Sequence, residues 1–395
     1  MRRNRLRSVV LLTGVLGGGL VIVPVLPTVA GASTQPVTIG VDHSTPSGHN
    51  FEYVDYFPRA DVAVHSGDVV DFQWADTPDG LHTATLLATG HSPTTTWANN
   101  ALAAADADDP GQLQINPAIG APTHPPAGSP APDACGNAAT PCNFDGTSDL
   151  NSGASPTNTG SHFVVKITAG PGTYTYVCLI HHGMSGSFTV VGPHASASKP
   201  GRLAEQARDQ ARADTQGALA AEDAVPAPLY QGNGDGTRTV TVTAGTATPY
   251  VEVAEMLPQR TVIRAGDTIK WITSTLKDPH TVTFPQGSDP STEPIPSECE
   301  AAPNDVPLTA PPVGPPCGNP MLFENHFNPL PVGGSVISSP LTVATSGVFT
   351  NAPPPTPNSA SFSFPNSGQF TYQCRIHDHM TGIVVVRPAR SGDGG

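Results

Sequence analysis

Hydrophobic and polar residues alternate along several short stretches of the chain. The alternation has period two in residues 163–167, 174–178, 362–364 and 370–374, and Gly, Pro or Asn residues bound each stretch. Strict alternation is typical of a β-strand with one buried face. Because such strands recur between turn residues, we predict an all-β chain built from antiparallel β-sandwiches.

One segment has a helical pattern instead. Residues 202–222 are rich in Ala, Gln, Glu and Arg, and prolines flank them at positions 200 and 226. Small apolar residues recur on one helical face, which Asp214 interrupts. We predict an exposed helical linker, at most loosely packed on a neighbouring domain. A helix of roughly twenty residues spans about 30 Å, enough to hold two domains well apart.

The sequence on either side of this helix contains an internal repeat. Three pairs of segments correspond: 58–74 with 258–271, 79–83 with 277–281, and 174–184 with 370–380. The distances between landmarks agree closely, because His82 precedes Cys178 by 96 residues and His280 precedes Cys374 by 94. We therefore expect two copies of one domain.

These landmarks suggest the boundaries of the domains. We place the first domain at residues 35–192, a partly helical linker at 193–235 and the second domain at 236–388. Each copy contains a long insert before its cysteine strand, at residues 91–160 and 285–360, rich in Pro, Gly, Ser, Thr and Asn. Such a composition forms ordered loops only where something fixes it.

Cysteines are the expected fixing points of the inserts. Four of the six lie there, and pairing within each insert, Cys135 with Cys142 and Cys299 with Cys317, is the simplest of three connectivities. Composition agrees with a loop-rich β protein: 44 Pro and 40 Gly in 395 residues, with 13% charged residues, exclude a helical bundle and a coiled coil.

The N-terminal segment has the pattern of an export signal. Four arginines in residues 2–7 precede an apolar run from Val9 to Val23, and small residues follow at 30–32. An uncleaved membrane anchor is the alternative, but the run is short and Pro24 and Pro27 follow it. We predict a signal peptide at 1–32, a secreted or extracytoplasmic location, and no membrane span after cleavage.

Removal of this segment makes the chain strongly acidic. The segment contains 4 of the 18 basic residues and none of the 32 acidic ones, which leaves 14 basic and 32 acidic residues and a net charge of −18. Such a surface repels phosphate backbones, so we expect no nucleic-acid partner.

The repeated motif carries the chemistry. Cys178, His181 and Met184 follow one another at intervals of three, and His82 lies far upstream; Cys374, His377, Met380 and His280 repeat this set. One thiolate, two imidazoles and one thioether suit copper in an electron-transfer site. Zinc would prefer further thiolates or a carboxylate and has little use for methionine.

In these motifs both halves resemble cupredoxins, the plastocyanin and amicyanin type of blue copper domain. The resemblance covers the two ends of each copy, and Thr83 and Thr281 replace the asparagine usual in the family. It implies two tandem Greek-key sandwiches with two type 1 copper ions per chain. The implied metal ligands are His82, Cys178, His181, Met184, His280, Cys374, His377 and Met380. It also implies that His181 and His377 lie near a solvent-facing docking surface.

Three functions are compatible with this set. We expect a secreted electron carrier that exchanges electrons with redox protein partners. A multicopper oxidase or nitrite reductase is less expected, because no histidine adjoins either cysteine: the neighbours are Val177, Leu179, Gln373 and Arg375. Extracellular copper buffering or delivery needs the same ligands and stays open.

The other histidines are weaker candidates. His182 and His379 adjoin the ligands and could belong to a partner-facing edge. The remaining ones have no repeated counterpart and are expected on the surface or in loops: His43, His49, His65, His91, His124, His162, His194 and His326.

Overall fold

The structure is a computed structural model of the chain. It describes residues 36–74, 82–99, 103–105, 113–115, 123, 135–153, 162–275, 279–287, 333–351, 357–377 and 379–389. The predicted signal peptide, the predicted Cys299–Cys317 pair, His124 and His326 lie outside these residues. The described residues belong to one compact unit.

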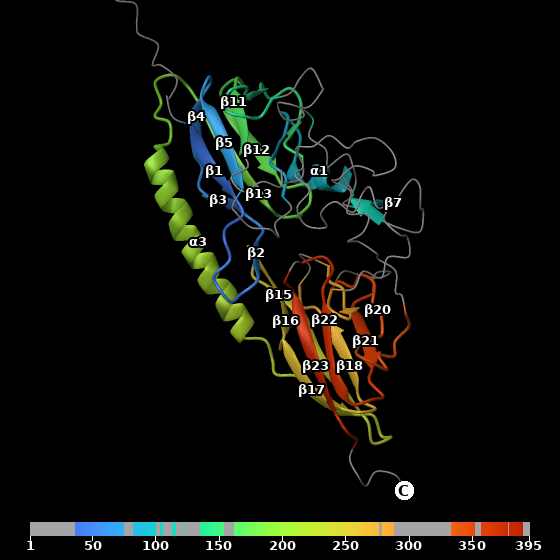
Figure 1. Cartoon of the computed structure of the whole chain (residues 1–395). Helices are drawn as coiled ribbons and strands as arrows, with labels where there is room; N and C mark the ends of the chain where they lie inside the picture. Colours follow the sequence, from blue (N-terminus) through green and yellow to red (C-terminus); the bar gives the residue numbers. More distant parts are fainter. Residues whose placement is uncertain are drawn as a thin grey trace, which may run out of the picture. The chain divides into compact units, whose positions relative to one another are not determined.

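The first repeat folds into two five-stranded sheets (Figure 1). One sheet has the order β3-β1-β5-β11-β9, formed by Tyr56–Phe57, Val37–Val41, Val69–Trp74, His162–Ile167 and Cys142–Phe144. The other has the order β10-β6-β12-β13-β4, formed by Leu150–Asn151, Thr85–Leu86, Gly172–Val177, Ser185–Val191 and Val62–His65. Both sheets contribute to one core, which contains Ile39, Phe72, Val165, Tyr176 and Phe188.

The second repeat has the same architecture. Its first sheet has the order β2-β16-β15-β18-β21, formed by Phe51–Tyr53, Val251–Leu257, Arg238–Ala247, Thr268–Ile272 and Ser359–Ser363, with β14 (Leu229–Gly232) beside β15. Its second has the order β17-β23-β22-β19-β20, formed by Arg260–Arg264, Thr381–Arg387, Gly368–Gln373, Thr283–Phe284 and Ala344–Thr345. Trp271, Phe284, Phe364 and Tyr372 fill its core.

Strand pairing confirms the all-β, two-sheet sandwich predicted for both repeats. The parallel pair β1 and β5 corresponds to β15 and β18, and the parallel pair β4 and β13 corresponds to β17 and β23. The antiparallel pair β12 and β13, which brackets the first Cys-x-x-His-x-x-Met loop, corresponds to β22 and β23. The sheets are therefore mixed, whereas the alternating pattern led us to expect antiparallel strands throughout.

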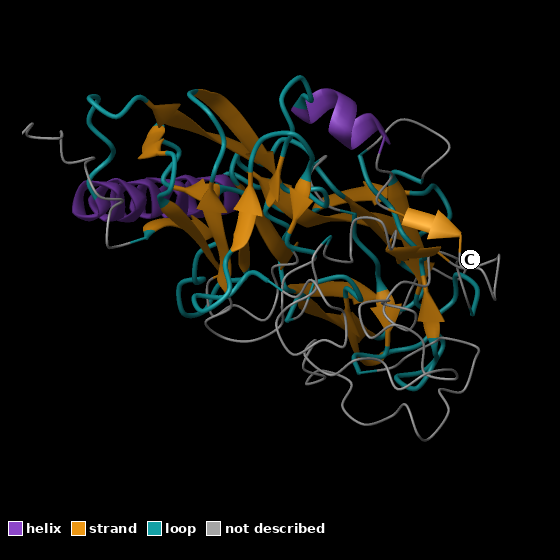
Figure 2. Ribbon diagram, turned by 90° about the horizontal axis from the view of Figure 1, so that it is seen from above, coloured by secondary structure: helices purple, strands orange, loops and turns teal. Residues whose placement is uncertain are grey.

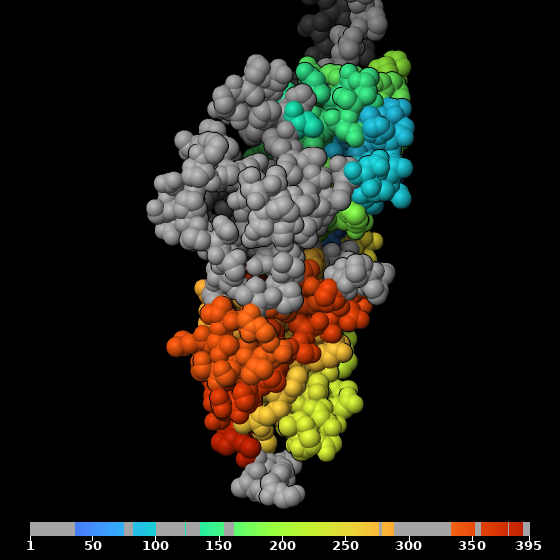
Figure 3. Space-filling model, turned by 90° about the vertical axis from the view of Figure 1, so that its right-hand side faces the viewer, coloured from blue at the N-terminus to red at the C-terminus, as the bar shows by residue number. Residues whose placement is uncertain are grey.

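The inserts are ordered where they join a sheet. The disulfide between Cys135 and Cys142 confirms that pair and anchors β9 beside β11. In the second insert the backbone N–H of Ile337 donates to Ser363 in β21, and the Ile337 side chain is buried in the core. This segment, residues 333–351, is orange in Figure 3 and exposes Val336, Leu341 and Val343. In the first insert, β7 (Ala103–Ala105) pairs with β8 (Leu113–Ile115).

In the described residues, two helices accompany the strands (Figure 2): α1, Pro93–Asn99, and α3, Pro200–Asp223. Helix α3 begins where Pro200 fits the first turn, whose N–H groups have no intrahelical partner. It packs against β1 and β3 of the first repeat and β15 and β16 of the second. No helix in the described part of the chain is long and apolar enough to cross a membrane.

The packing of α3 corrects the prediction of an exposed linker. Leu203, Ala211, Asp214 and Ala218 are buried. The interruption at Asp214 is a paired charge, because the guanidinium of Arg59 donates a 2.7 Å hydrogen bond to its carboxylate. The helix is therefore a packed element that contacts both sandwiches.

A strand of the first repeat completes a sheet of the second. Strand β2 pairs antiparallel with β16, with Glu52 opposite Glu252. Backbone hydrogen bonds extend the ladder on both sides, from Ala254 to Asn50 at 2.8 Å and from Val54 to Tyr250 at 3.0 Å. The two repeats thus share a sheet, and the expectation that the helix holds them well apart is wrong.

Candidate metal centres

Each predicted ligand lies in a loop next to a strand. His82 precedes β6, and Cys178, His181 and Met184 lie in the loop between β12 and β13. In the second repeat, His280 precedes β19, and Cys374, His377 and Met380 lie between β22 and β23. Strand pairing brings each upstream histidine beside its cysteine loop, since β6 pairs with β12 and β19 with β22.

Backbone hydrogen bonds close both loops. The N–H of Cys178 donates to the carbonyl of Met184 at 3.0 Å, and the N–H of Met184 donates to His181 at 3.1 Å. The corresponding bonds in the second loop measure 2.8 and 3.3 Å. The residue before each methionine has a left-handed backbone, with φ of 103° at Gly183 and 60° at His379. The spacing of three residues is thus built into a tight turn that directs the ligands to one point.

The first centre is a compact, buried triad. The Nδ1 atoms of His82 and His181 lie 3.0 Å apart, and the Cys178 sulfur lies 3.9 and 3.8 Å from them. Met184 is also buried, at 1% exposure. The facing atoms are thus two imidazole Nδ1 atoms and one sulfur, the His₂Cys set of the trigonal copper geometry.

The second centre repeats this arrangement. The ligand atoms of His280, Cys374 and His377 all lie within 4.8 Å of one another, and the Cys374 sulfur is 3.6 Å from Nδ1 of His377. Met380 is buried beside them. The structure therefore assembles the predicted histidines and cysteine of both repeats and buries the methionine of each.

The surroundings of both thiols lower their pKa. Burial alone would raise the pKa of Cys178, but hydrogen bonds with His181 and His82 outweigh it and place the pKa well below its ordinary value. Burial also raises the pKa of Cys374, but the interaction with His280 and the backbone N–H groups of Thr281 and Ile376 outweigh it, so this pKa is lowered as well. The thiolate is the form of cysteine that binds metal. In the described part of the chain these two cysteines are the free ones.

Thr83 and Thr281, which replace the family's asparagine, hold the cysteines in place. The backbone N–H of each threonine donates to the neighbouring sulfur at 3.4 Å. The hydroxyl of Thr83 accepts from the N–H of Leu179 at 2.8 Å, and that of Thr281 accepts from Arg375 at 2.7 Å. Each threonine thereby fixes both the sulfur and the residue after it.

Helix α1 adds a contact that the sequence did not reveal. The indole N–H of Trp97 donates to the carbonyl of Cys178 at 2.7 Å, and the ring stacks on His182 at 5.5 Å. Burial lowers the pKa of His182. Trp97 lies in an insert without strand periodicity, so no local pattern marked it.

The outward nitrogens of the metal-site histidines face two glutamates. Glu52 lies 3.3 Å from Nε2 of His181 and 3.6 Å from Nε2 of His377, and Glu252 lies 3.4 Å from Nε2 of His280. His181 and His377 are 7% and 4% exposed, so the structure buries the imidazoles that the resemblance places near solvent. Sequence reasoning missed both glutamates, although each stands six residues before the repeated proline, Pro58 or Pro258.

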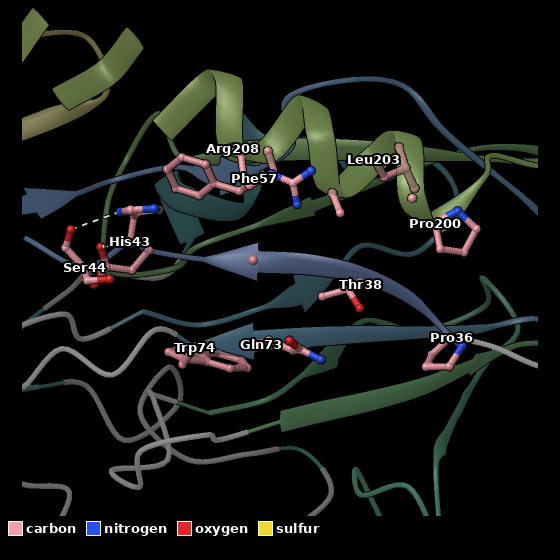
Figure 4. Close-up of a pocket in the computed structure, with 15 residues that line it drawn as sticks. Pro36, Thr38, His43, Ser44, Phe57, Gln73, Trp74, Pro200, Leu203 and Arg208 are labelled. Carbon is pink, nitrogen blue, oxygen red and sulfur yellow. Dashed lines mark hydrogen bonds between the residues drawn. The ribbon is translucent and has the colours of Figure 1, made fainter. Parts of the chain in front are cut away.

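Two other features lie away from these centres. His49, Glu222 and Glu255 form a partly exposed cluster, with Nδ1 of His49 at 2.9 Å from Glu222 and 3.7 Å from Glu255. A hollow of about 750 Å³ lies between α3 and β1, with Trp74 and Arg208 in its wall (Figure 4). None of the eight predicted ligands is among the described residues that line it.

The chain was also compared with known proteins. No family model matches it, and no curated protein matches its sequence. It is similar to solved structures of amicyanin. A Cu(I) variant is 15% identical over 42% of this chain and 95% of that chain, with a TM-score of 0.20. Amicyanin from Paracoccus versutus is 17% identical over 42% and 89%, with a TM-score of 0.19. At such identities the likeness concerns the fold alone.

Proposed function

We propose that this protein binds two copper ions in type 1 centres and acts in electron transfer. The observation that supports this most directly is the pair of buried triads, each with two histidines and one cysteine whose ligand atoms lie within 4.8 Å of one another. A buried methionine accompanies each triad, as the weak axial position of a type 1 site requires. Every donor in the set is one that copper accepts.

Copper would supply a one-electron couple at these positions. The residues of the chain would supply a fixed geometry. His82, Cys178 and His181 would hold the first ion, and His280, Cys374 and His377 the second, with Met184 and Met380 at the weak positions. Because the loops are closed by backbone hydrogen bonds and the threonines anchor the cysteines, the donors have little freedom to rearrange.

We also propose that the protein works outside the cytoplasm and is not an enzyme. The Cys135–Cys142 disulfide supports an oxidising compartment, as does the export pattern in residues 1–32. Redox proteins are the proposed partners. The neighbours of Cys178 and Cys374 in the sequence are not histidines, which disfavours an adjacent catalytic copper cluster.

Spectroscopy with metal counting tests this proposal. We expect about two coppers per chain, an intense thiolate-to-copper absorption band and no type 2 resonance in paramagnetic-resonance spectra. The double variant Cys178→Ser and Cys374→Ser is the matched control and should lack the band. A stoichiometric type 2 signal, or turnover of oxygen or nitrite, would instead indicate an enzyme.

Copper storage or delivery is a second candidate function. The observation that favours it is the burial of His181 and His377, because a partner cannot touch these imidazoles directly. Voltammetry separates the two functions. A carrier gives a reversible one-electron wave for each centre and rapid exchange with small redox proteins, whereas a storage protein transfers copper to a chelator faster than it exchanges electrons.

A further inference from the structure

We infer that Glu52 is a positioning residue shared by both metal centres, whereas Glu252 serves the second centre alone. This inference rests on the proposed function, because it concerns how the two triads hold copper. In this view, the pairing of β2 with β16 places the carboxylate of Glu52 between histidines of the two repeats.

The distances support the sharing. Oε1 of Glu52 lies 3.3 Å from Nε2 of His181 and 3.9 Å from Nε2 of His82, both in the first centre. Its other oxygen, Oε2, lies 3.6 Å from Nε2 of His377 in the second centre. The carboxylate is 5% exposed, so water screens these contacts little.

The chemistry of the imidazole explains why a carboxylate belongs there. The Nδ1 atoms of His82, His181 and His377 face a cysteine sulfur, so a neutral ring that gives Nδ1 to a metal carries its proton on Nε2. A carboxylate that accepts from this N–H fixes the tautomer and the ring orientation and makes the ring a better ligand. Glu52 faces the Nε2 atom of one ring in each centre, His181 at 3.3 Å and His377 at 3.6 Å.

The register of the shared sheet places two glutamates opposite each other, and this pairing would destabilise the sheet if the glutamates had no such role. Glu52 and Glu252 are direct partners in the antiparallel ladder, so their side chains share one face. Like charges in that position destabilise a sheet, and burial adds a desolvation cost. Glu252 is completely buried and accepts a 2.8 Å hydrogen bond from the hydroxyl of Thr275. Contacts between these carboxylates and the imidazoles of the two centres offset these costs; the imidazoles are those of His82, His181, His280 and His377.

The two glutamates differ in reach. Glu252 lies 3.4 Å from the Nε2 atom of His280, in the second centre. Glu52 instead lies near histidines of both centres. We therefore expect replacement of Glu52 to affect both centres and replacement of Glu252 to affect the second. A role confined to holding the interface together would affect both centres equally for either glutamate.

Single-centre variants of the full chain test this difference. Cys374→Ser leaves the first centre and Cys178→Ser leaves the second, and Glu52→Gln or Glu252→Gln is added to each. Copper affinity is measured by competition with a chromophoric Cu(I) chelator. We expect Glu52→Gln to weaken binding by about 10- to 100-fold in both backgrounds, the range typical of such outer contacts. We expect Glu252→Gln to do so only in the Cys178→Ser background.

A neighbouring carboxylate provides the matched control. Glu255 also lies on β16 and accepts from the N–H of Asn50 across the same ladder, but it contacts His49 instead of a metal-site histidine. Glu255→Gln should leave both copper affinities and both thiolate-to-copper bands unchanged. Near-ultraviolet circular dichroism of each metal-free variant shows whether it folds, and Glu52→Asp, which keeps the charge, should recover part of the affinity and band position if Glu52→Gln is misfolded.

The outcomes separate this inference from the proposed function. If Glu52→Gln changes one centre or neither, or if Glu252→Gln changes both alike, the shared role is wrong while the copper centres stand. If the chain with both glutamates intact shows no thiolate-to-copper band, the proposed function fails and the inference fails with it.

Discussion

The sulfur atoms of Cys178 and Cys374 accept hydrogen bonds from the backbone as well as from imidazoles. The threonine N–H makes the same 3.4 Å contact in both centres. The second donor differs, because it is the N–H of His181 in the first centre and of Ile376 in the second, each at 3.4 Å. Hydrogen bonds around this sulfur tune the reduction potential of a type 1 site. We therefore expect the two centres to have different potentials.

Replacement of the axial residues tests their assignment. Met184→Leu and Met380→Leu conserve volume in a packed site and should cost less than about 1.5 kcal/mol of stability. A weak axial ligand contributes little to affinity and more to tuning, so copper should stay bound while the potential of the altered centre shifts. Spectroelectrochemical titration measures both. An unchanged potential would show that the methionine is not a ligand.

The threonine hydroxyls should matter for folding even without metal. Thr83→Val removes the acceptor for the buried N–H of Leu179, and an unpaired buried donor costs about 1–3 kcal/mol. Urea unfolding of the metal-free protein measures this loss. Thr189→Val is the control, because its hydroxyl pairs with Thr173 at an exposed position and its replacement should change stability by about 0.5 kcal/mol or less. Equal losses would contradict the prediction.

At the scale of elements, the end of α3 is tied to β16 by charges. Glu222 of the helix and Glu255 of the strand both face His49. Burial raises the pKa of Glu255 above its ordinary value, the charge of Glu222 adds to this, and the Asn50 N–H and His49 oppose it. The folded state thus favours the protonated form of Glu255.

This shift gives a pH dependence of stability with a definite sign. A carboxyl whose pKa is higher in the folded than in the unfolded state stabilises the folded protein. This contribution is complete at pH values below the pKa of the unfolded state, near 4.5, and it is lost as the pH rises through the pKa of the folded state. The Glu255→Gln variant lacks this titrating carboxyl, so its stability does not fall for this reason as the pH rises. The difference in unfolding free energy between variant and parent, from urea titrations between pH 4 and 7, should therefore move in favour of the variant as pH rises. A trend in the opposite direction would contradict the assignment.

The elements also show what sequence could and could not predict. The strands, the repeat and the candidate metal-site residues were predictable because period-two alternation and the Cys-x-x-His-x-x-Met spacing are local signals. The packing of α3 was not, because the partner of Asp214 is Arg59, 155 residues away. The position of β2 was hidden for the same reason: its partner β16 lies in the other repeat. Glu52 thus looked like an ordinary strand residue.

At the scale of the whole molecule, the repeats are joined by a shared apolar cluster. Phe51, Tyr53 and Phe57 of the first repeat pack with Val251 and Val253 of the second and with α3. The hydroxyls of Tyr53 and Thr215 on the helix lie 2.6 Å apart. Since the ladder, the helix and this cluster all cross between repeats, we expect the two sandwiches to unfold together.

Calorimetry tests this cooperativity. The parent should show one transition, and Phe51→Ala should lower the unfolding free energy by about 3–5 kcal/mol, as expected for a buried phenylalanine. Because that variant weakens the contact between the repeats, its transition should broaden or divide. Two separate transitions in the parent would show that the repeats are independent.

The pairing of β2 with β16 also bears on fragments of the chain. A fragment that begins after α3 would keep nearly all of the second sandwich but would lose β2, leaving one side of β16 with unpaired N–H and C=O groups. Open strand edges of this kind recruit strands from other molecules. We therefore expect the isolated C-terminal half to self-associate through β16. A synthetic peptide spanning residues 49–55 should suppress this association by taking the place of β2.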